Sequence, residues 1–364
     1  MNTIVDLTRV VTLICATILA VESCLAKCAP LELESPKLTT SYKPVVDQLQ
    51  KDAFTGAIVV AHKGDDLFFA GFGDSSTPSG RPDSNTLVDI GSITKTLTAV
   101  AALRLVDQGK LSMKDRIEKF FPHAPKRKLN ITIHQLLTHS SGLPHSVAQD
   151  RTGISKDEFL KRTMDAELLF KPGEKFQYSN VGYSLIAAVI EQVSKTSFEG
   201  FVRGSLLKDS KKSSIGYQAT YRSDRSILTP EGETISQNSW GGTPKWELIG
   251  NGGMIATPTD LADFLRKLNK GDIISPAALK LFRSPHIREG RAPSHYGYGV
   301  VVEDHPKYGR VYWHNGGNGT FSATWAHYSD HDLLIVTAAN SPKLDSDKAA
   351  SMVLKQALNN HKTK

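Results

Sequence analysis

Hydrophobic and polar residues alternate over short stretches at the two ends of the chain. The apolar runs 57–61 and 67–72 flank the turn sequence Lys63-Gly64-Asp65 and predict a β-hairpin. Near the other end, the pattern predicts strands over 297–303, 311–315, 320–327 and 333–337. Because helical spacing fills the chain between them, we expect an α/β fold of the α+β type. Two distant segments would form one antiparallel sheet flanked by helices.

Helix start signals are frequent in the middle of the chain. Ser155 precedes a helical pattern over 156–164, and Thr257 with Pro258 supplies an N-cap and a first-turn proline for a helix over 261–268. Residues 180–193 form a strongly apolar helical pattern, and Ser197 is the cap expected for a short helix after it. Further helices are predicted over 43–51, 112–121, 132–139 and 346–358.

These patterns divide the chain into three parts. Residues 1–26 are interpreted as a signal peptide, because Arg9 precedes an apolar run, 10–21, that is shorter than the about 20 residues of a membrane span. We expect a discontinuous α/β domain over 27–143 and 251–364, and an all-helical insert domain over 144–250. The mature protein is expected to be periplasmic or secreted, without stable membrane insertion. A retained short anchor and lipidation of Cys24 are the alternatives.

Cysteine content and charge exclude several classes of protein. All three cysteines, Cys15, Cys24 and Cys28, fall in the first 28 of the 364 residues, so the chain after them has neither a disulfide framework nor a catalytic thiol. The formal net charge of +7 is dispersed, apart from short basic runs at 126–128 and 211–212. These runs are interpreted as solvated loops, and no nucleic-acid partner is expected, because no nucleic-acid-binding module accompanies them.

Ser92 and Lys95 are the first candidates for chemistry. At a spacing of three they share one face of a helix, and a lysine with a lowered pKa is able to activate a serine hydroxyl. A second Ser-x-x-Lys lies at 205–208, and serine is also a common helix cap. Only Ser92 follows a short apolar run and Gly91 and precedes a helical pattern that extends to Gly109. This context favours Ser92 as a nucleophile.

Two further clusters follow in order along the chain. Tyr178 and Asn180 form its one Tyr-x-Asn, and a tyrosine beside a lysine cation is expected to have a lowered pKa and to shuttle protons. His314 and Gly316 end an apolar strand, although His/Lys-x-Gly by itself carries little information. His139, at the end of a helix and before a glycine turn, is interpreted as a packing or capping group rather than a catalytic one.

In the order Ser92-x-x-Lys95, Tyr178-x-Asn180 and His314-x-Gly316, the chain resembles the serine β-lactamase and penicillin-binding-protein family. Within it, the resemblance is to the branch of class C β-lactamases, D-alanyl-D-alanine carboxypeptidases and esterases. It covers about residues 40–360 and includes the stretches 136–143, 172–173, 178–183 and 252–257.

The resemblance implies a β-lactamase/transpeptidase-like fold and a role for each site residue. Ser92 would form an acyl-enzyme, Lys95 and Tyr178 would relay protons, Asn180 would bind the acyl side chain, and the N–H groups of Ser92 and Gly317 would form the oxyanion hole. No metal or organic cofactor is implied. The substrate would be a small molecule or a peptidoglycan-like peptide, selected by loops over 210–246 and 285–298.

The residue at position 314 helps to distinguish between the activities found in this family. Class C β-lactamases usually carry lysine there, so histidine looks more like carboxypeptidases, aminopeptidases and esterases. We expect carboxylate substrates to bind better as the pH falls through the histidine pKa. A class C-like β-lactamase and a catalytically silent cell-wall- or penicillin-binding protein are the alternatives. Neither the Gly-x-Ser-x-Gly elbow of α/β-hydrolases nor a His-Glu-x-x-His zinc motif occurs in the chain.

Overall fold

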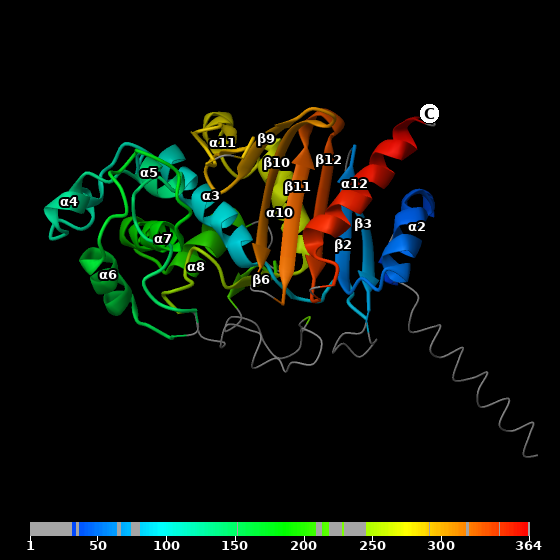
Figure 1. The fold of residues 1–364 in the computed structure, drawn as a ribbon, viewed down its shortest axis with the longest axis horizontal. Coiled ribbons are helices and arrows are strands. Elements are labelled where there is room, and N and C mark those ends of the chain that lie inside the picture. Colours follow the sequence, from blue (N-terminus) through cyan, green and yellow to red (C-terminus); the bar gives the residue numbers. More distant parts are fainter. Residues whose placement is uncertain are drawn as a thin grey trace, which may run out of the picture.

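The computed structural model describes most of the chain after residue 30, and its arrangement is shown in Figure 1. The described residues are 31–33, 36–63, 67–73, 81–150, 152–208, 213–217, 228, 245–290, 292–317, 320–341 and 343–362. The predicted signal peptide and nearly all of 210–243 lie outside them. Among the described residues, no helix combines the length and apolarity needed to cross a membrane.

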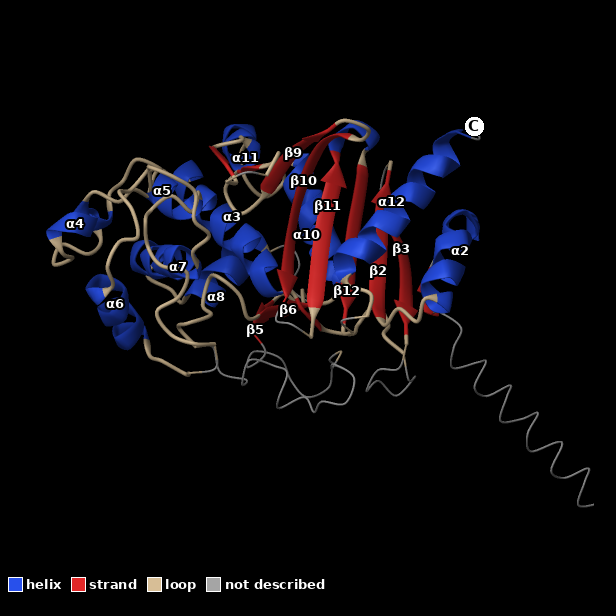
Figure 2. Ribbon diagram, in the orientation of Figure 1, coloured by secondary structure: helices blue, strands red, loops and turns tan. Residues whose placement is uncertain are grey.

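One nine-stranded antiparallel sheet forms the centre of the molecule (Figure 2). Its spatial order is β1 (Leu31–Leu33), β3 (Leu67–Phe72), β2 (Gly56–His62), β12 (Leu333–Ala339), β11 (Ser322–Tyr328), β10 (Gly309–Gly317), β9 (Val301–His305), β8 (His295–Tyr296) and β7 (Ile287–Arg288). The N-terminal hairpin joins the C-terminal strands where β2 pairs with β12, with Val59 opposite Val336. This confirms the predicted sheet of two distant chain segments.

Successive side chains along each strand point to opposite faces of the sheet. Ile58 and Val60 pack in the core under α2 (Pro36–Lys51) and α12 (Ser346–Lys362), whereas Val59 packs in a larger core with the helices on the other face. Those helices include α3 (Thr94–Asp107) and α10 (Pro258–Lys270). In Figure 1, α12 crosses in front of the sheet and α10 lies behind it.

Several further helices gather at one end of the molecule, to the left in Figure 1. They are α4 (Lys126–Leu129), α5 (Ile133–Leu137), α6 (Lys156–Asp165), α7 (Asn180–Ser194), α8 (Phe198–Phe201) and the π-helix η3 (Val202–Leu206). Ser155 and Ser197 cap α6 and α8 as predicted, through Glu158 N and Gly200 N. The α7 helix is buried continuously from Val181 to Ile190. The division into domains stays a prediction.

Several predicted boundaries are wrong for identifiable reasons. The helix expected over 112–121 contains only the short 3₁₀ turn η2 (Ile117–Lys119), since the Asp115 carboxylate accepts from Ser112 N and forms a local turn. Strand β9 starts later than expected, because Gly299 has a φ of 69°. The helix α11 (Pro276–Arg283), capped by Ser275, was not predicted.

A small three-stranded sheet lies close to Ser92 in the chain. It consists of β4 (Val88–Asp89), β6 (Met254–Ala256) and β5 (Gly216–Tyr217). Ile90 N donates to Met254 O over 3.1 Å, and the Asp89 carboxylate accepts from Gly91 N at 2.7 Å. These bonds fix the turn that carries the chain from β4 into the Ser92 segment.

Candidate active site

Ser92 lies in the 3₁₀ turn η1 (Gly91–Ile93), which runs directly into α3. Lys95, on the first turn of α3, is fully buried, and its Nζ lies 3.0 Å from Ser92 Oγ. The same Nζ donates to the carbonyl oxygen of Asn251 at 2.6 Å. The predicted serine–lysine pair is therefore in hydrogen-bond contact, and a distant segment of the chain also holds the lysine.

Burial lowers the pKa of Lys95 well below its ordinary value, because a buried ammonium loses its hydration. A neutral amine has two N–H bonds and one lone pair. One N–H binds the Asn251 carbonyl, and the lone pair is then available to the Ser92 hydroxyl proton. The pair has the form of a nucleophile with its base.

Tyr178 lies in the segment that leads into α7, and its hydroxyl is near enough to the Ser92 side chain to affect the phenol pKa. Lys95 Nζ lies 4.7 Å from the centre of its ring. The expectation of a lowered phenol pKa is wrong, since burial raises the pKa of Tyr178. A neutral Lys95 does not offer the cation that would stabilise a phenolate. Tyr178 is therefore a proton donor in the resting site, and Lys95 is the acceptor.

His139 packs against the ring of Tyr178 and holds the backbone beside it. His139 is fully buried with a φ of 56°, and its ring centre lies 4.3 Å from that of Tyr178. Its backbone oxygen accepts from Gln177 N at 2.8 Å, and its Nδ1 accepts from Ser179 N at 3.0 Å. His139 thus packs, as predicted, and also holds the backbone on both sides of the tyrosine.

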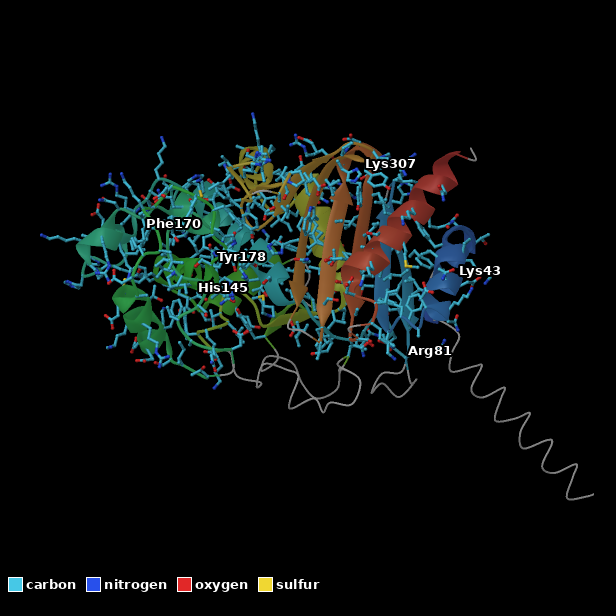
Figure 3. All side chains as sticks on the ribbon, in the orientation of Figure 1. Lys43, Arg81, His145, Phe170, Tyr178 and Lys307 are labelled. Carbon is cyan, nitrogen blue, oxygen red and sulfur yellow. The ribbon has the colours of Figure 1, made fainter. Side chains whose placement is uncertain are left out.

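Asn180 is the first residue of α7, two positions after Tyr178. Its Nδ2 lies 3.4 Å from His145 Nε2, and its buried Oδ1 has no hydrogen-bond partner among the described residues. Figure 3 shows Tyr178 and His145 close together, and their ring centres are 6.0 Å apart. The amide lies beside the site, but it does not line the cleft described below.

His314 lies on β10 and is nearly fully buried. Its Nε2 lies 2.9 Å from the Tyr296 hydroxyl and its Nδ1 lies 2.6 Å from the Asn315 carbonyl oxygen. A neutral ring that donates from Nδ1 and accepts at Nε2 satisfies both contacts. Burial lowers the pKa of His314 to about 3. The expectation that this histidine gains charge as the pH falls through its usual range is therefore wrong.

Gly316 and Gly317 bring the end of β10 against the nucleophile turn. A Cβ on Gly316 would lie 2.5 Å from Ser92 N, and a Cβ on Gly91 would lie 2.7 Å from Gly317 N. Side chains at these positions would collide with the backbone, so glycine is required for the close approach. The approach brings the backbone of Gly317 beside that of Ser92, as a two-donor oxyanion site requires.

A cleft of about 500 Å³ opens in front of Ser92. It is lined by Ser92, Tyr178, Glu289, Tyr296, Val301, Trp313, His314, Asn315, Gly316, Gly317, Ser322, Ser346 and Asp347. The sequence interpretation did not identify Tyr296, which bonds His314, or the carboxylates Glu289 and Asp347. The only available signal was that Glu289 and Tyr296 fall in 285–298, a stretch expected to form a selectivity loop.

The fold and the cleft together define the active-site arrangement of a protein with a serine nucleophile. The serine lies at the start of a helix, next to a lysine, a tyrosine and a strand that ends in two glycines. Within the described residues, no group of three or more His, Cys, Asp or Glu side chains is placed to hold a metal ion. Residues 43–359 match the sequence model of the Beta-lactamase family, so the chain belongs to that family.

Comparison with individual proteins agrees with this assignment. A penicillin-binding protein of Bacillus subtilis (strain 168) is 27% identical over 340 residues, which cover 85% of this chain and 72% of the relative. A penicillin-binding protein from Bacillus halodurans superposes with a TM-score of 0.72 at 21% identity, covering 86% of this chain and 99% of that one. D-amino acid amidase from Ochrobactrum anthropi SV3 gives 0.73 at 18% identity, covering 90% and 99%. The two superpositions confirm the predicted fold.

Proposed function

We propose that this protein is an exported serine hydrolase that cleaves an amide or ester bond through an acyl-enzyme at Ser92. One observation carries the proposal: Ser92 Oγ lies 3.0 Å from the Nζ of a fully buried lysine. Such a lysine is a base in its resting state, and a serine hydroxyl needs a base to become a nucleophile. The export signal at 1–26 and a periplasmic or secreted location belong to the same proposal.

In acylation, Ser92 Oγ forms a bond to the substrate carbonyl carbon while its proton passes to the lone pair of Lys95. The carbonyl electron pair moves to its oxygen, which the N–H groups of Ser92 and Gly317 stabilise. When the intermediate collapses, the bond to the leaving nitrogen or oxygen breaks. The proton reaches that atom through the Tyr178 hydroxyl, which lines the cleft together with Ser92. Attack of water on the ester then releases the acid and restores Ser92.

The neutral His314 supports small esters and D-amino-acid peptides as substrates in preference to β-lactams. A lysine at this position would attract the carboxylate that most β-lactams carry, and the imidazole does not. A panel of a chromogenic cephalosporin, p-nitrophenyl butyrate and a D-Ala-D-Ala peptide tests this preference. Cephalosporin turnover that exceeds the other two activities would instead support the class C-like alternative.

Labelling with a fluorophosphonate, followed by peptide mapping, tests the nucleophile. We expect one labelled peptide containing Ser92, and loss of the label in Ser92→Ala. Ser205→Ala, in the second Ser-x-x-Lys, is the matched control and should label like the unaltered protein. Label retained in Ser92→Ala would refute the assignment, and a folded protein that takes no label would support the catalytically silent alternative.

A further inference from the structure

Among the described residues that line the cleft, the charged groups are of one sign. Among its described lining residues, the ionisable side chains are Glu289, Asp347, His314 and the tyrosines, and no lysine or arginine is present. The imidazole of His314 and the phenols are neutral near pH 7. Lys95 lies behind Ser92 as a neutral amine and is not part of the lining. The two carboxylates therefore set the potential that a substrate meets.

Glu289 lies between β7 and β8 and lines the cleft of Ser92. Ser294 Oγ donates to Glu289 Oε2 at 2.6 Å, and Glu289 N donates to Ser294 O at 3.1 Å. Within the described part of the chain, Oε1 accepts no hydrogen bond. The carboxylate is near enough to Tyr178 and Tyr296 for its negative charge to raise the pKa of both phenols.

The neighbouring residue on β7 has the opposite charge and faces elsewhere. Arg288 lines a separate cavity with Lys175, His134 and His286, whereas Glu289 lines the cleft of Ser92. Adjacent residues of an extended chain point to opposite sides, so one hairpin places a cation outside the reaction cleft and an anion inside it. The charges that act on Glu289 from nearby are those of His295 and Glu303.

Asp347 adds a second negative charge to the lining. It lies on the first turn of α12, and its carboxylate accepts from Asn315 Nδ2 at 3.0 Å and from the Thr324 hydroxyl. Asn315 and Asp347 both line the cleft. Because these donors already hold Asp347, Glu289 Oε1 is the better placed acceptor for a group that the substrate brings.

We propose that Glu289 binds an ammonium group of the substrate, so that the preferred substrates are amino-acid amides, amino-acid esters or peptides with a free amino group. This inference rests on the proposed serine hydrolase function and names its substrate class. A hydrogen bond between charged groups that exclude water is expected to change affinity by about 10- to 100-fold. A carboxylate at the same position on the substrate would be repelled.

The test compares three alanine p-nitroanilides that differ only at nitrogen: free amine, N-acetyl and N-succinyl, each as the D and L form. For the unaltered enzyme, kcat/KM should fall in the order ammonium, neutral amide, carboxylate. In Glu289→Gln the ratio of free-amine to N-acetyl kcat/KM should fall by about tenfold or more, mainly through KM. Glu289→Asp, which keeps the charge, should retain part of the ratio.

Glu174→Gln is the matched control, because it makes the same acid-to-amide change in the separate cavity that Arg288 lines, outside the cleft. It should leave the ratio unchanged. A free-amine to N-acetyl ratio near one in the unaltered enzyme, or a ratio that Glu289→Gln does not alter, overturns the inference. In that outcome Ser92-dependent turnover of the N-acetyl compound still supports the proposed function. If Glu289→Gln does not fold, the order of the three compounds on the unaltered enzyme decides.

Discussion

The chain contains Ser-x-x-Lys twice, and the two copies have different surroundings. Lys95 is fully buried in α3 and contacts both Ser92 and the Asn251 carbonyl. Lys208 is exposed just after the π-helix that contains Ser205. The spacing is the same in both copies, but burial lowers the pKa of Lys95. The comparison shows that the lysine becomes a base through burial and not through the motif alone.

Replacing each of the two lysines by alanine, in separate variants, is the strongest test of this difference. Lys95→Ala should lower the rate constant of Ser92 acylation by about 10²- to 10⁴-fold, the usual loss when a general base is removed. Lys208→Ala should acylate like the unaltered enzyme. Stopped-flow acylation with p-nitrophenyl butyrate measures both. Equal effects of the two substitutions would mean that burial does not distinguish the copies.

Removing the phenol hydroxyl tests the second proton-transfer group. Tyr178→Phe keeps the ring against His139 but loses the hydroxyl that acts beside Ser92, and acylation should slow by about 10²-fold. The loss should be larger for amides than for p-nitrophenyl esters, since the amide nitrogen must be protonated to leave. Full acylation activity in Tyr178→Phe would remove the tyrosine from the mechanism.

The protonation of Lys95 predicts the pH dependence of the reaction. Because its pKa is lowered, the acylating form is the deprotonated amine. The rate should rise with pH through the Lys95 pKa and become constant well below the pH of about 10.4 at which a solvated lysine titrates. A profile that continues to rise up to that value would show that Lys95 is charged in the resting enzyme. Single-turnover acylation between pH 4 and 10 measures the profile.

The His139 contacts predict a smaller effect on rate and a measurable effect on stability. His139→Ala removes the acceptor of Ser179 N and the ring packed on Tyr178, at an expected cost of about 1–3 kcal/mol in unfolding free energy. The acylation rate should fall by about tenfold, with the pH profile unchanged, because the residue acts through the position of Tyr178. His139→Asn offers an amide oxygen and should restore part of both. Urea unfolding and the pH profile separate these outcomes.

The smallest effect is expected at His314. Since burial lowers its pKa to about 3, it stays neutral between pH 5 and 8. The KM of the N-succinyl substrate should therefore follow the same pH dependence over this range in the unaltered enzyme and in His314→Gln. An inflection near pH 6.5 that disappears in His314→Gln would show that the imidazole ionises after all.

The sequence by itself determined the features that depend on local order. Alternation predicted the strands that became β2, β3 and β10 to β12, and polar caps such as Ser155 and Thr257 located helix starts. The order of Ser92-x-x-Lys95, Tyr178-x-Asn180 and His314-x-Gly316 predicted the family that the comparisons show. These signals can be read from the sequence because each strand pattern, cap and motif involves residues only a few positions apart.

The tertiary structure alone decided the electrostatics of the site. The expected fall in the Tyr178 pKa depends on a charged Lys95 beside the phenol, and burial of both groups reverses that direction. Glu289 and Asp347 are 58 positions apart in the chain, and only the folding of the β7–β8 hairpin and of α12 around β10 places them in one cleft. Protonation depends on the water that folding excludes and on charges brought from distant segments, which local spacing does not encode.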